Sequence, residues 1–371
     1  MPQISVVMSA YNHSKFIKES IESVLNQTYQ DFELLIIYDN STDNTFEIIS
    51  AFSSPKIWCS KNQQNVGMVL NTNRLIAMAK GEYIAIINSD DSWHYQKLEK
   101  QLQFLEQNQQ LAGCFTLANT INEKSNIISL KKETFLYQNY SKEQFLAYFF
   151  HQQKHHFCYP SVLIKKEVLE QVGLFNPALI LLLDFEMWVK ILLAGFELKI
   201  LPENLTNFRV LNDNANLGGA GEKSTIRIAL EMKQILLNYT KITNYTSFVS
   251  IFSDYSPKNG QNLALPGYFY LLDYCFDKYF ANKTKNHHIK NFILEFVQFK
   301  SFADSNFYIS WQQNCGLTFA DYLKISMQYP NGNLLCYKKK ISTKLVRGSV
   351  ISLIIFCFIC YFWYKFYLFL A

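Results

Sequence analysis

The sequence predicts an α/β fold in which a mainly parallel sheet is covered by helices on both faces. Over roughly the first third of the chain, apolar runs of strand length alternate with segments whose apolar residues recur at helical spacing. The apolar runs are almost unbroken, as expected of strands that are buried on both faces. The 371-residue chain is also 49% hydrophobic and 18% charged, which favours a large packed core over disorder.

Each element in this part of the chain has its own local signal. The segment 4–8 is a compact apolar run, whereas 14–26 carries apolar side chains at helical spacing. Thr42 or Asp43 can cap a helix, and Gly81 ends another. In order, we expect strand 4–8, helix 14–26, strand 33–38, a helix after residue 43, strand 56–60, helix 68–79 and strand 83–87.

The pattern is weaker in the rest of the chain. After a strand at 113–118, the sequence becomes irregular before apolar periodicity returns. Beyond residue 240 the chain is rich in Phe and Tyr and is expected to be helical. The later expected elements are strand 159–164, helix 166–172, an amphipathic helix 184–193 and helix 223–239.

Polar residues follow three of the expected parallel strands. These strand ends are residues 9–12, 39–43 and 88–91, and the last two are acidic. In open sheets of this kind, ligands bind outside the carboxyl ends of the strands. The fold pattern alone therefore predicts a ligand site built from these three loops.

The C-terminal segment 345–371 is expected to lie in a membrane. Residues 348–364 carry no charge, and as a helix the whole stretch would span roughly 36 Å, enough for a bilayer core of about 30 Å. From residue 331 to the end there are six Lys or Arg and no acidic residue, which favours anionic lipid and a cytoplasmic location for the preceding domain. A buried or interfacial helix is the alternative. The rest of the sequence contains no basic stripe, so nucleic acid is not an expected partner.

Asp90 and Asp91 are the acidic pair with the clearest chemistry. They end an apolar strand, where one or two carboxylates can hold a hard divalent cation against a leaving diphosphate. Adjacent residues at a strand end point to opposite sides, so they are a poor pair of hydrolase carboxylates. Alternatively, the pair caps a helix that begins near Trp93.

Two stretches place these residues in a longer pattern: "ISVVMSAYNHSKFIKESIESVLNQTYQDFELLIIYDNSTDNT" and "NVGMVLNTNRLIAMAKGEYIAIINSDDSW". The first resembles the opening of the family 2 glycosyltransferases, which have the Rossmann-like GT-A fold. The second resembles the family's Asn-x-Gly helix, its Ala-x-Gly-Glu-Tyr turn and its Asp-x-Asp-type metal motif. About twenty positions match in order over ninety residues.

The resemblance implies a role for several residues at the donor. Asp39 would bind the nucleobase, flanked by the turn of Ala10 and Tyr11. Asp91 would bind Mg²⁺ or Mn²⁺ at the donor diphosphate, and Asp90 would contact the sugar or ribose. A second group, Asn65 and Gly67, would shape the loop that closes on the nucleoside, although Gly67 also fits a tight turn.

A later part of the chain resembles the acceptor half of the family. It reads "SVLIKKEVLEQVGLFN" followed by "LLLDFEMWVKILLAGFELKILPENLTNFRV". By this resemblance Asp184 is the general base for an inverting in-line transfer. Trp188 is part of the core or an acceptor platform, and Arg209 contacts a phosphate or forms a structural ion pair. His156, with its neighbour His155, lies in the acceptor pocket or in a surface loop.

Three residues depart from the family's pattern. Tyr38 and Asn88 stand where the family commonly has Asp, and Leu183 replaces the usual Glu before Asp184. A neighbouring carboxylate helps to orient the base, so the change at Leu183 raises the question of how Asp184 is oriented.

These observations predict an inverting glycosyltransferase of cell-surface or lipid-linked glycan synthesis. The expected partners are a nucleoside-diphosphate sugar, in particular a UDP-sugar, a glycan or lipid-linked acceptor, and membrane lipid at the cytoplasmic face of a bacterial inner membrane. A catalytically weak relative that binds nucleotide or glycan as a scaffold subunit is the alternative; a nucleotidyltransferase is disfavoured because no Gly-rich triphosphate loop follows Met8. The expected organisation is a donor half at 1–115, an acceptor half at 116–235, an aromatic-rich helical region at 236–340 and the membrane segment at 345–371.

Overall fold

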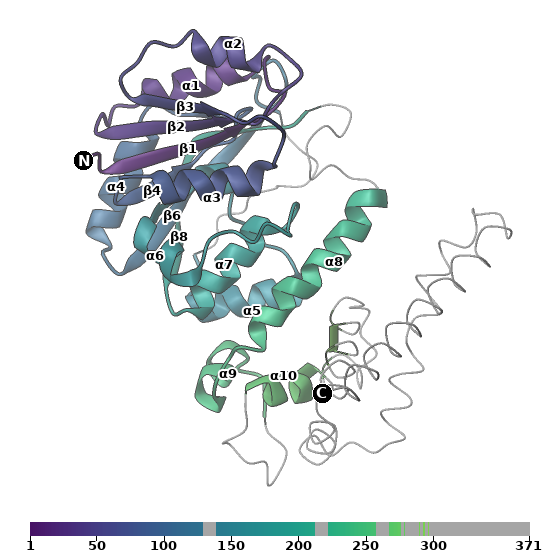
Figure 1. Ribbon diagram of the computed structural model, residues 1–371. Coiled ribbons are helices and arrows are strands. Elements are labelled where there is room, and N and C mark those ends of the chain that lie inside the picture. The colour runs from purple at the N-terminus through teal and green to yellow at the C-terminus, as the bar shows by residue number, and fades with distance from the viewer. Residues whose placement is uncertain are drawn as a thin grey trace, which may run out of the picture. The chain divides into compact units, whose positions relative to one another are not determined.

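One eight-stranded sheet organises the chain up to Arg209, with strand order β3-β2-β1-β4-β7-β6-β8-β5 (Figure 1). The computed structural model describes residues 1–128, 139–211, 222–256 and 267–275, and the single residues 278, 289, 292, 293 and 296. The strands are β1 (Ile4–Ala10), β2 (Phe32–Tyr38), β3 (Ile57–Lys61), β4 (Tyr83–Ile86), β5 (Ser92–Trp93), β6 (Leu111–Ile121), β7 (Leu163–Lys165) and β8 (Glu197–Arg209).

The sheet is mixed, which corrects the prediction of a mainly parallel one. Strands β1 to β4 pair in parallel, as the sequence indicated, and β6 pairs in parallel with β8. The short strand β7, however, lies antiparallel between β4 and β6, and β5 lies antiparallel to β8. A strand of three residues inserted between two longer ones carries no periodic signal, so the sequence could not reveal its direction.

Helices cover both faces of the sheet, as predicted. Side chains alternate along β1, so Ile4, Val6 and Met8 share a core with the apolar faces of α1 and α4. On the opposite face, Ser9 accepts a hydrogen bond from Asn71 of α3, and α3 packs on β1 and β2. Figure 1 shows α1 and α2 on one side of β1–β3 and α3 on the other.

The helices agree with the prediction where their periodicity was strong. The observed elements are α1 (Ile17–Leu25), α2 (Thr45–Ser50), α3 (Met68–Met78), α4 (Lys97–Gln107), α5 (Lys142–Gln152), the 3₁₀ turn η1 (Tyr159–Ser161), α6 (Lys166–Val172), α7 (Leu183–Leu193), α8 (Glu222–Tyr239), α9 (Tyr245–Ile251) and α10 (Gly267–Cys275).

Two local predictions needed correction. The expected strand at 159–164 is instead the turn η1 followed by β7, because Pro160 lies in the first turn and has no amide to give to a ladder. Strand β8 and helix α5 were not predicted, although Ser141 and Gln144 form a capping box at the start of α5. The helix considered near Trp93 begins at Lys97, and Trp93 itself lies in β5.

The chain divides into two units, Met1–Phe292 and Ile293–Ala371. The predicted boundary between donor and acceptor halves, at 115/116, falls inside β6 of the first unit. Among the described residues no helix is long and apolar enough to cross a membrane. The predicted membrane segment 345–371 lies outside the described residues.

Candidate active site

Because β1, β2 and β4 run in parallel, the loops that follow them meet at one edge of the sheet. Side-chain hydrogen bonds tie the first two loops together. The Asn12 amide donates to Ser41 Oγ at 2.9 Å, and the Thr42 amide donates to Asn12 Oδ1 at 2.9 Å. The Ser14 amide donates to Asp43 Oδ2 at 2.9 Å. These three hydrogen bonds join the loop after β1 to the loop after β2.

Asp39, predicted to bind the nucleobase, lies directly after β2 and is 1% exposed. Its Oδ1 accepts from Asn62 Nδ2 at 2.7 Å and from the Val66 amide at 3.0 Å, and its Oδ2 accepts from the Gly67 amide at 2.9 Å. Burial raises the pKa of Asp39, but these hydrogen bonds outweigh burial and leave it below the ordinary value. The ionised carboxylate thus fastens the loop that was predicted to close on the nucleoside.

The other residues predicted for the donor lie around Asp39. The Ala10 carbonyl accepts from the Asp39 amide at 2.9 Å, and the Ala10 side chain is buried. Tyr11 is 41% exposed at the rim, and Asn65 is exposed. Gly67 has φ +91°, a backbone conformation that favours glycine, and it directly precedes α3. It therefore forms a tight turn and, by doing so, shapes the loop.

Both carboxylate oxygens and the carbonyl oxygen of Asp91 accept hydrogen bonds from other residues of the chain. It is 1% exposed; its Oδ1 accepts from the Arg209 amide at 2.7 Å and its Oδ2 from Asn88 Nδ2 at 2.9 Å. Its carbonyl accepts from Ser20 Oγ at 2.6 Å. Burial and the neighbouring charge of Asp90 raise the pKa of Asp91, and the two donors only partly offset this.

Asp90 is the more accessible of the two carboxylates, with 12% of its side chain exposed. Its Oδ2 lies 3.8 Å from His13 Nε2, and His13 Nδ1 lies 2.7 Å from Ser89 Oγ. Burial raises the pKa of Asp90, and His13 acts in the opposite direction. Within the part of the chain that the structure describes, no three His, Cys, Asp or Glu side chains form a group that could enclose a metal ion.

Arg209 lies behind this acidic loop with its side chain fully buried. Its Nε donates to the Asp90 carbonyl at 2.6 Å, its Nη1 donates to the Asn122 carbonyl at 2.8 Å, and its Nη2 pairs with Glu19 Oε2 at 2.7 Å. The guanidinium also stacks on Phe16, 4.7 Å from the ring centroid. These contacts agree with the alternative in which Arg209 forms a structural ion pair and does not contact a phosphate.

Asp184, predicted to be the base, lies in the first turn of α7. Its Oδ1 accepts from the Phe185 amide at 2.8 Å, and its Oδ2 lies 3.3 Å from His155 Nε2. The side chains of Asp184 and His155 are 16% and 17% exposed. Leu183, which replaces the family's Glu, is buried in the core.

A carboxylate from α8 fixes the backbone that leads to Asp184. Both oxygens of Glu231, which is 3% exposed, accept from the three amides of residues 180–182 at 2.8–2.9 Å. Burial raises the pKa of Glu231, but its ion pair with Arg227 and these amides leave it below the ordinary value. The segment before the predicted base is therefore anchored.

The charges of Asp91 and Asp184 both affect the pKa of one buried residue, Cys158. Burial raises the pKa of the Cys158 thiol well above its ordinary value, and the charges of Asp91 and then Asp184 raise it further. Asp184 also contributes to the raised pKa of Tyr159. The charges of both carboxylates therefore reach Cys158, at the start of the turn that leads to β7.

The other two residues predicted for the acceptor side, Trp188 and His156, have different surroundings. Trp188 is fully buried and stands edge-on to Phe115, with ring centroids 4.8 Å apart, which supports the core interpretation. His156 is half-buried against Tyr148 at 4.8 Å between ring centroids. Its pKa is lowered by burial and by the charges of His155 and Lys154.

Three residues outside the predicted set hold this site together. They are Glu19, Asn62 and Glu231, which act on Arg209, Asp39 and the approach to Asp184. Their partners lie 190, 23 and 50 positions away in the sequence, so no local pattern marked them. His155 was a candidate from its position, but its contact with Asp184 was not predicted.

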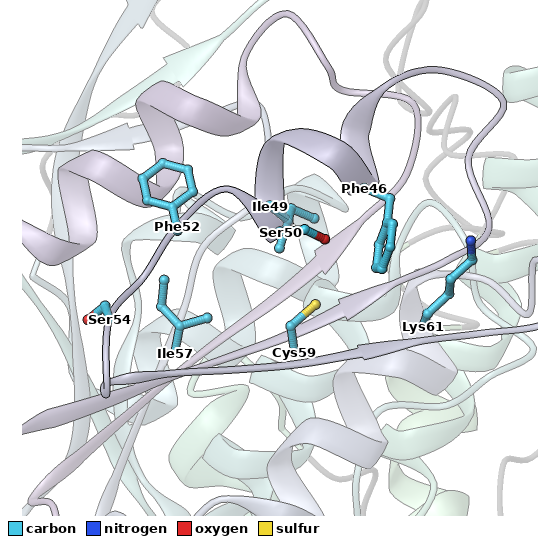
Figure 2. Close-up of a pocket in the computed structure, with 8 residues that line it drawn as sticks. All are labelled: Phe46, Ile49, Ser50, Phe52, Ser54, Ile57, Cys59 and Lys61. Atoms are coloured by element: carbon cyan, nitrogen blue, oxygen red, sulfur yellow. The ribbon is translucent and has the colours of Figure 1, made fainter.

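A pocket of about 430 Å³ lies elsewhere, between α2 and β3. Figure 2 shows its lining, which contains Lys61 as its one charged side chain. It contains none of the carboxylates described above, and it therefore offers a divalent cation no carboxylate ligand. Its lining residues are Phe46, Ile49, Ser50, Phe52, Ser54, Ile57, Cys59 and Lys61.

Comparison with known proteins identifies the class. The profile of Glycosyl transferase family 2 matches residues 5–173. The chain is 32% identical over 215 residues to the uncharacterized glycosyltransferase MJ1057 of Methanocaldococcus jannaschii. The aligned residues make up 57% of this chain and 72% of MJ1057. The chain belongs to glycosyltransferase family 2 and is an enzyme of class EC 2.4.

Two further likenesses extend this result. Over 129 residues the chain is 36% identical to the UDP-Glc:alpha-D-GlcNAc-diphosphoundecaprenol beta-1,3-glucosyltransferase WfaP of Escherichia coli, covering 35% of this chain and 50% of WfaP. The crystal structure of S. aureus TarS 1–349 in complex with UDP-GlcNAc aligns with a TM-score of 0.56 and 16% identity, covering 80% of this chain and 81% of that chain. At this identity the likeness shows the GT-A-like fold alone.

Proposed function

We propose that this enzyme transfers a sugar, with inversion, from a UDP-sugar to a hydroxyl group of a lipid-linked or cell-surface glycan, with Asp184 as the base. The observation that carries the proposal is the cluster of carboxylates at the carboxyl ends of the parallel strands: Asp39 directly follows β2, and Asp90 and Asp91 lie in the loop after β4. The named substrates of WfaP, UDP-Glc and a diphosphoundecaprenol-linked GlcNAc, support the choice of donor and acceptor class.

The nucleoside binds at the ends of β1 and β2 in this proposal. Asp39 has three donors from the protein but retains accepting capacity, since an ionised carboxylate has about four lone-pair positions. The backbone at Ala10 and the exposed ring of Tyr11 border it, and loop 62–67 closes the other side.

The donor set suits Mg²⁺ or Mn²⁺, because hard cations take oxygen ligands and combine one or two carboxylates with substrate phosphates. When bound, the ion supplies positive charge that stabilises the leaving diphosphate. We assign it to Asp90 instead of Asp91, because 12% of the Asp90 side chain is exposed, whereas Asp91 is 1% exposed. Asp91 then fixes the loop so that the Asp90 carboxylate faces the donor.

This assignment is tested by comparing Asp90→Asn with Asp91→Asn. We expect Asp90→Asn to fold normally and to lose the Mn²⁺-dependent part of UDP affinity, measured by calorimetry. Asp91→Asn is expected to lower the unfolding temperature. Metal-dependent UDP binding that survives in Asp90→Asn and vanishes in a stable Asp91→Asn would reverse the assignment.

In the transfer step, Asp184 accepts the proton of the acceptor hydroxyl as its oxygen attacks C1 of the donor sugar. The new bond joins that oxygen to C1, and the bond from C1 to the diphosphate oxygen breaks. UDP leaves with the electron pair of the broken bond. A single displacement from the side opposite to UDP inverts the configuration at C1.

We also propose that the enzyme acts at the cytoplasmic face of a bacterial inner membrane. The support is the uncharged stretch 348–364 with its basic flank, together with a lipid-linked acceptor that such an anchor would concentrate in two dimensions. Flotation with anionic vesicles, for the full chain and for a chain ending at residue 344, tests this part. Equal flotation of the two would contradict it.

The transfer itself is tested with a panel of UDP- and GDP-sugars, Mn²⁺ and undecaprenyl-diphosphate-linked GlcNAc. We expect a UDP-sugar to raise the unfolding temperature with Mn²⁺, because ligand binding stabilises the folded state, and to yield UDP and glycosylated lipid. Asp184→Asn should lower kcat by about 10²- to 10⁴-fold while the donor still binds. An unchanged kcat would exclude Asp184 as the base.

The scaffold alternative makes a different prediction for the same panel. A binding subunit would take UDP and Mn²⁺ in the thermal assay but would form no product with any donor. The structure offers it no specific support, since the residues at the departures Tyr38, Asn88 and Leu183 are all accommodated by internal contacts or by burial in the core.

A further inference from the structure

His155 and Asp184 come from different elements and meet beside the acceptor side of the site. His155 lies between α5 and η1, and Asp184 lies in the first turn of α7. Their closest atoms, His155 Nε2 and Asp184 Oδ2, are 3.3 Å apart, and both side chains are largely buried. An imidazole N–H at this position can donate to the carboxylate with only a small movement.

Among the residues that the structure describes, His155 is the polar group that faces Asp184 Oδ2. The other oxygen, Oδ1, accepts from the Phe185 amide at 2.8 Å. The residue before it, Leu183, turns an apolar side chain into the core, so the neighbouring carboxylate that is usual in the family is absent here. Since Glu231 already fixes the preceding backbone, the remaining freedom of the base lies in its side-chain torsions.

The ring of His155 is itself held in place. It packs on Phe185 at 5.1 Å and Phe149 at 6.3 Å between ring centroids. Its Nδ1 is buried and has no hydrogen-bond partner among the described residues. A buried N–H without a partner is costly, so this surrounding favours the tautomer with hydrogen on Nε2, the nitrogen that faces Asp184.

We propose that His155 is a positioning residue for the base: its Nε2–H donates to Asp184 Oδ2 and holds that oxygen toward the acceptor hydroxyl. It takes over the orienting task of the carboxylate that Leu183 replaces. The proposal rests on the function proposed for Asp184. The distance of 3.3 Å shortens when the acceptor binds, as hydrogen bonds between catalytic groups commonly do on substrate binding.

Two substitutions separate this role from simple packing. His155→Phe keeps an aromatic ring against Phe149 and Phe185 but has no N–H donor. His155→Gln loses the ring but can place an amide N–H near the position of Nε2. If His155 only packed, Phe would be harmless and Gln damaging; if it positions the base, the order is reversed. His151, which lies in α5 and packs against Phe252 and Tyr274, is treated with the same two substitutions as the matched control.

The assay uses UDP-glucose, Mn²⁺ and undecaprenyl-diphosphate-linked GlcNAc, or the best donor of the panel above. We expect His155→Phe to lower kcat by roughly 10-fold or more, since a positioned base contributes about 10²- to 10⁴-fold in all. The KM for the donor and the unfolding temperature should stay unchanged. His155→Gln should recover most of the kcat, and neither substitution of His151 should lower kcat as His155→Phe does.

Parallel measurement of Asp184→Asn separates the two possible failures. If Asp184→Asn retains the parental kcat, the function proposed for Asp184 fails. If Asp184→Asn is inactive while His155→Phe keeps the parental kcat, the positioning role alone is overturned. A His155→Gln protein that is well folded and as slow as His155→Phe would also overturn it.

Discussion

Replacing Arg209 with Met tests whether this arginine supports the acidic loop or binds a donor phosphate. The substitution keeps most of the side-chain length and removes the charge and all five N–H donors. It leaves the buried Asp90 carbonyl without its Arg209 donor, whereas the partly buried Asn122 carbonyl keeps its hydrogen bond from the Ser125 amide at 3.0 Å. The stacking on Phe16 is lost as well.

The expected loss follows from these contacts. A buried carbonyl left without a donor costs about 1–3 kcal/mol, and loss of the cation–π contact adds roughly 0.5–1 kcal/mol. Glu19 is 40% exposed, so its lost ion pair adds under about 1 kcal/mol. We therefore expect the unfolding free energy to fall by about 1.5–5 kcal/mol, or roughly 0.5–1.7 M in urea midpoint at a slope near 3 kcal/mol/M.

The assay is urea unfolding followed by near-UV circular dichroism, with UDP and Mn²⁺ affinity measured on the folded fraction. Lys18→Met is the control, because it removes one exposed charge from α1 and should shift the midpoint by less than about 0.3 M. A parental midpoint in Arg209→Met together with weakened UDP binding would refute the structural role. It would favour the phosphate contact that the sequence left open.

Two further predictions concern the frame of the site. Hydrogen bonds hold the folded-state pKa of Glu231 below its ordinary value, so its stabilisation is present above about pH 4.5 and is lost as pH falls through the lowered pKa. In urea unfolding from pH 6 to pH 3, Glu231→Gln should therefore approach the parental stability only at the acid end; a constant gap would contradict this. Gly81→Ala would place Cβ 2.5 Å from the Ser5 amide nitrogen, and should lower the unfolding temperature by more than Gly195→Ala, which meets no atom within 4 Å but sits at φ +96°. Equal shifts for the two glycine variants would show that the close approach to β1 is not limiting.

Much of the donor side could be predicted from the sequence, because its signals are local. Apolar runs gave β1, β2 and β4 close to their observed bounds, and polar residues at the strand ends indicated the site edge. Helix α6 occupies the predicted range 166–172, and α8 differs by one residue from the prediction. Strong periodicity over a whole element is what made these predictions reliable.

The contacts that give the site its shape were out of reach of the sequence. Arg209 reaches Asp91 across 118 positions and Glu19 across 190, and both contacts depend on where β8 lies in the sheet. That place depends on the antiparallel insertion of β7, which is too short to show a period. A pattern of residue types can name a carboxylate, but only the strand order decides which arginine it meets.

Two departures from the family pattern acquire a physical explanation in the structure. Tyr38 stands where the family commonly has Asp. Its hydroxyl donates to the Ser41 carbonyl at 2.9 Å and so stabilises the loop that follows β2. Asn88 donates to Asp91 at 2.9 Å. An Asp at that position would place a third carboxylate against a buried pair, where like charges already raise the pKa of Asp91.

Leu183 is the departure that bears most on activity. Its side chain is 5% exposed in the core, so a Glu in the same orientation would bury a charge without a partner. The chain therefore cannot orient Asp184 through its neighbour in sequence and has to do so through contacts in space. Glu231 anchors the approaching backbone, and His155 faces the oxygen that would otherwise turn freely. On this reasoning the change at Leu183 relocates the orienting contact and is compatible with full activity.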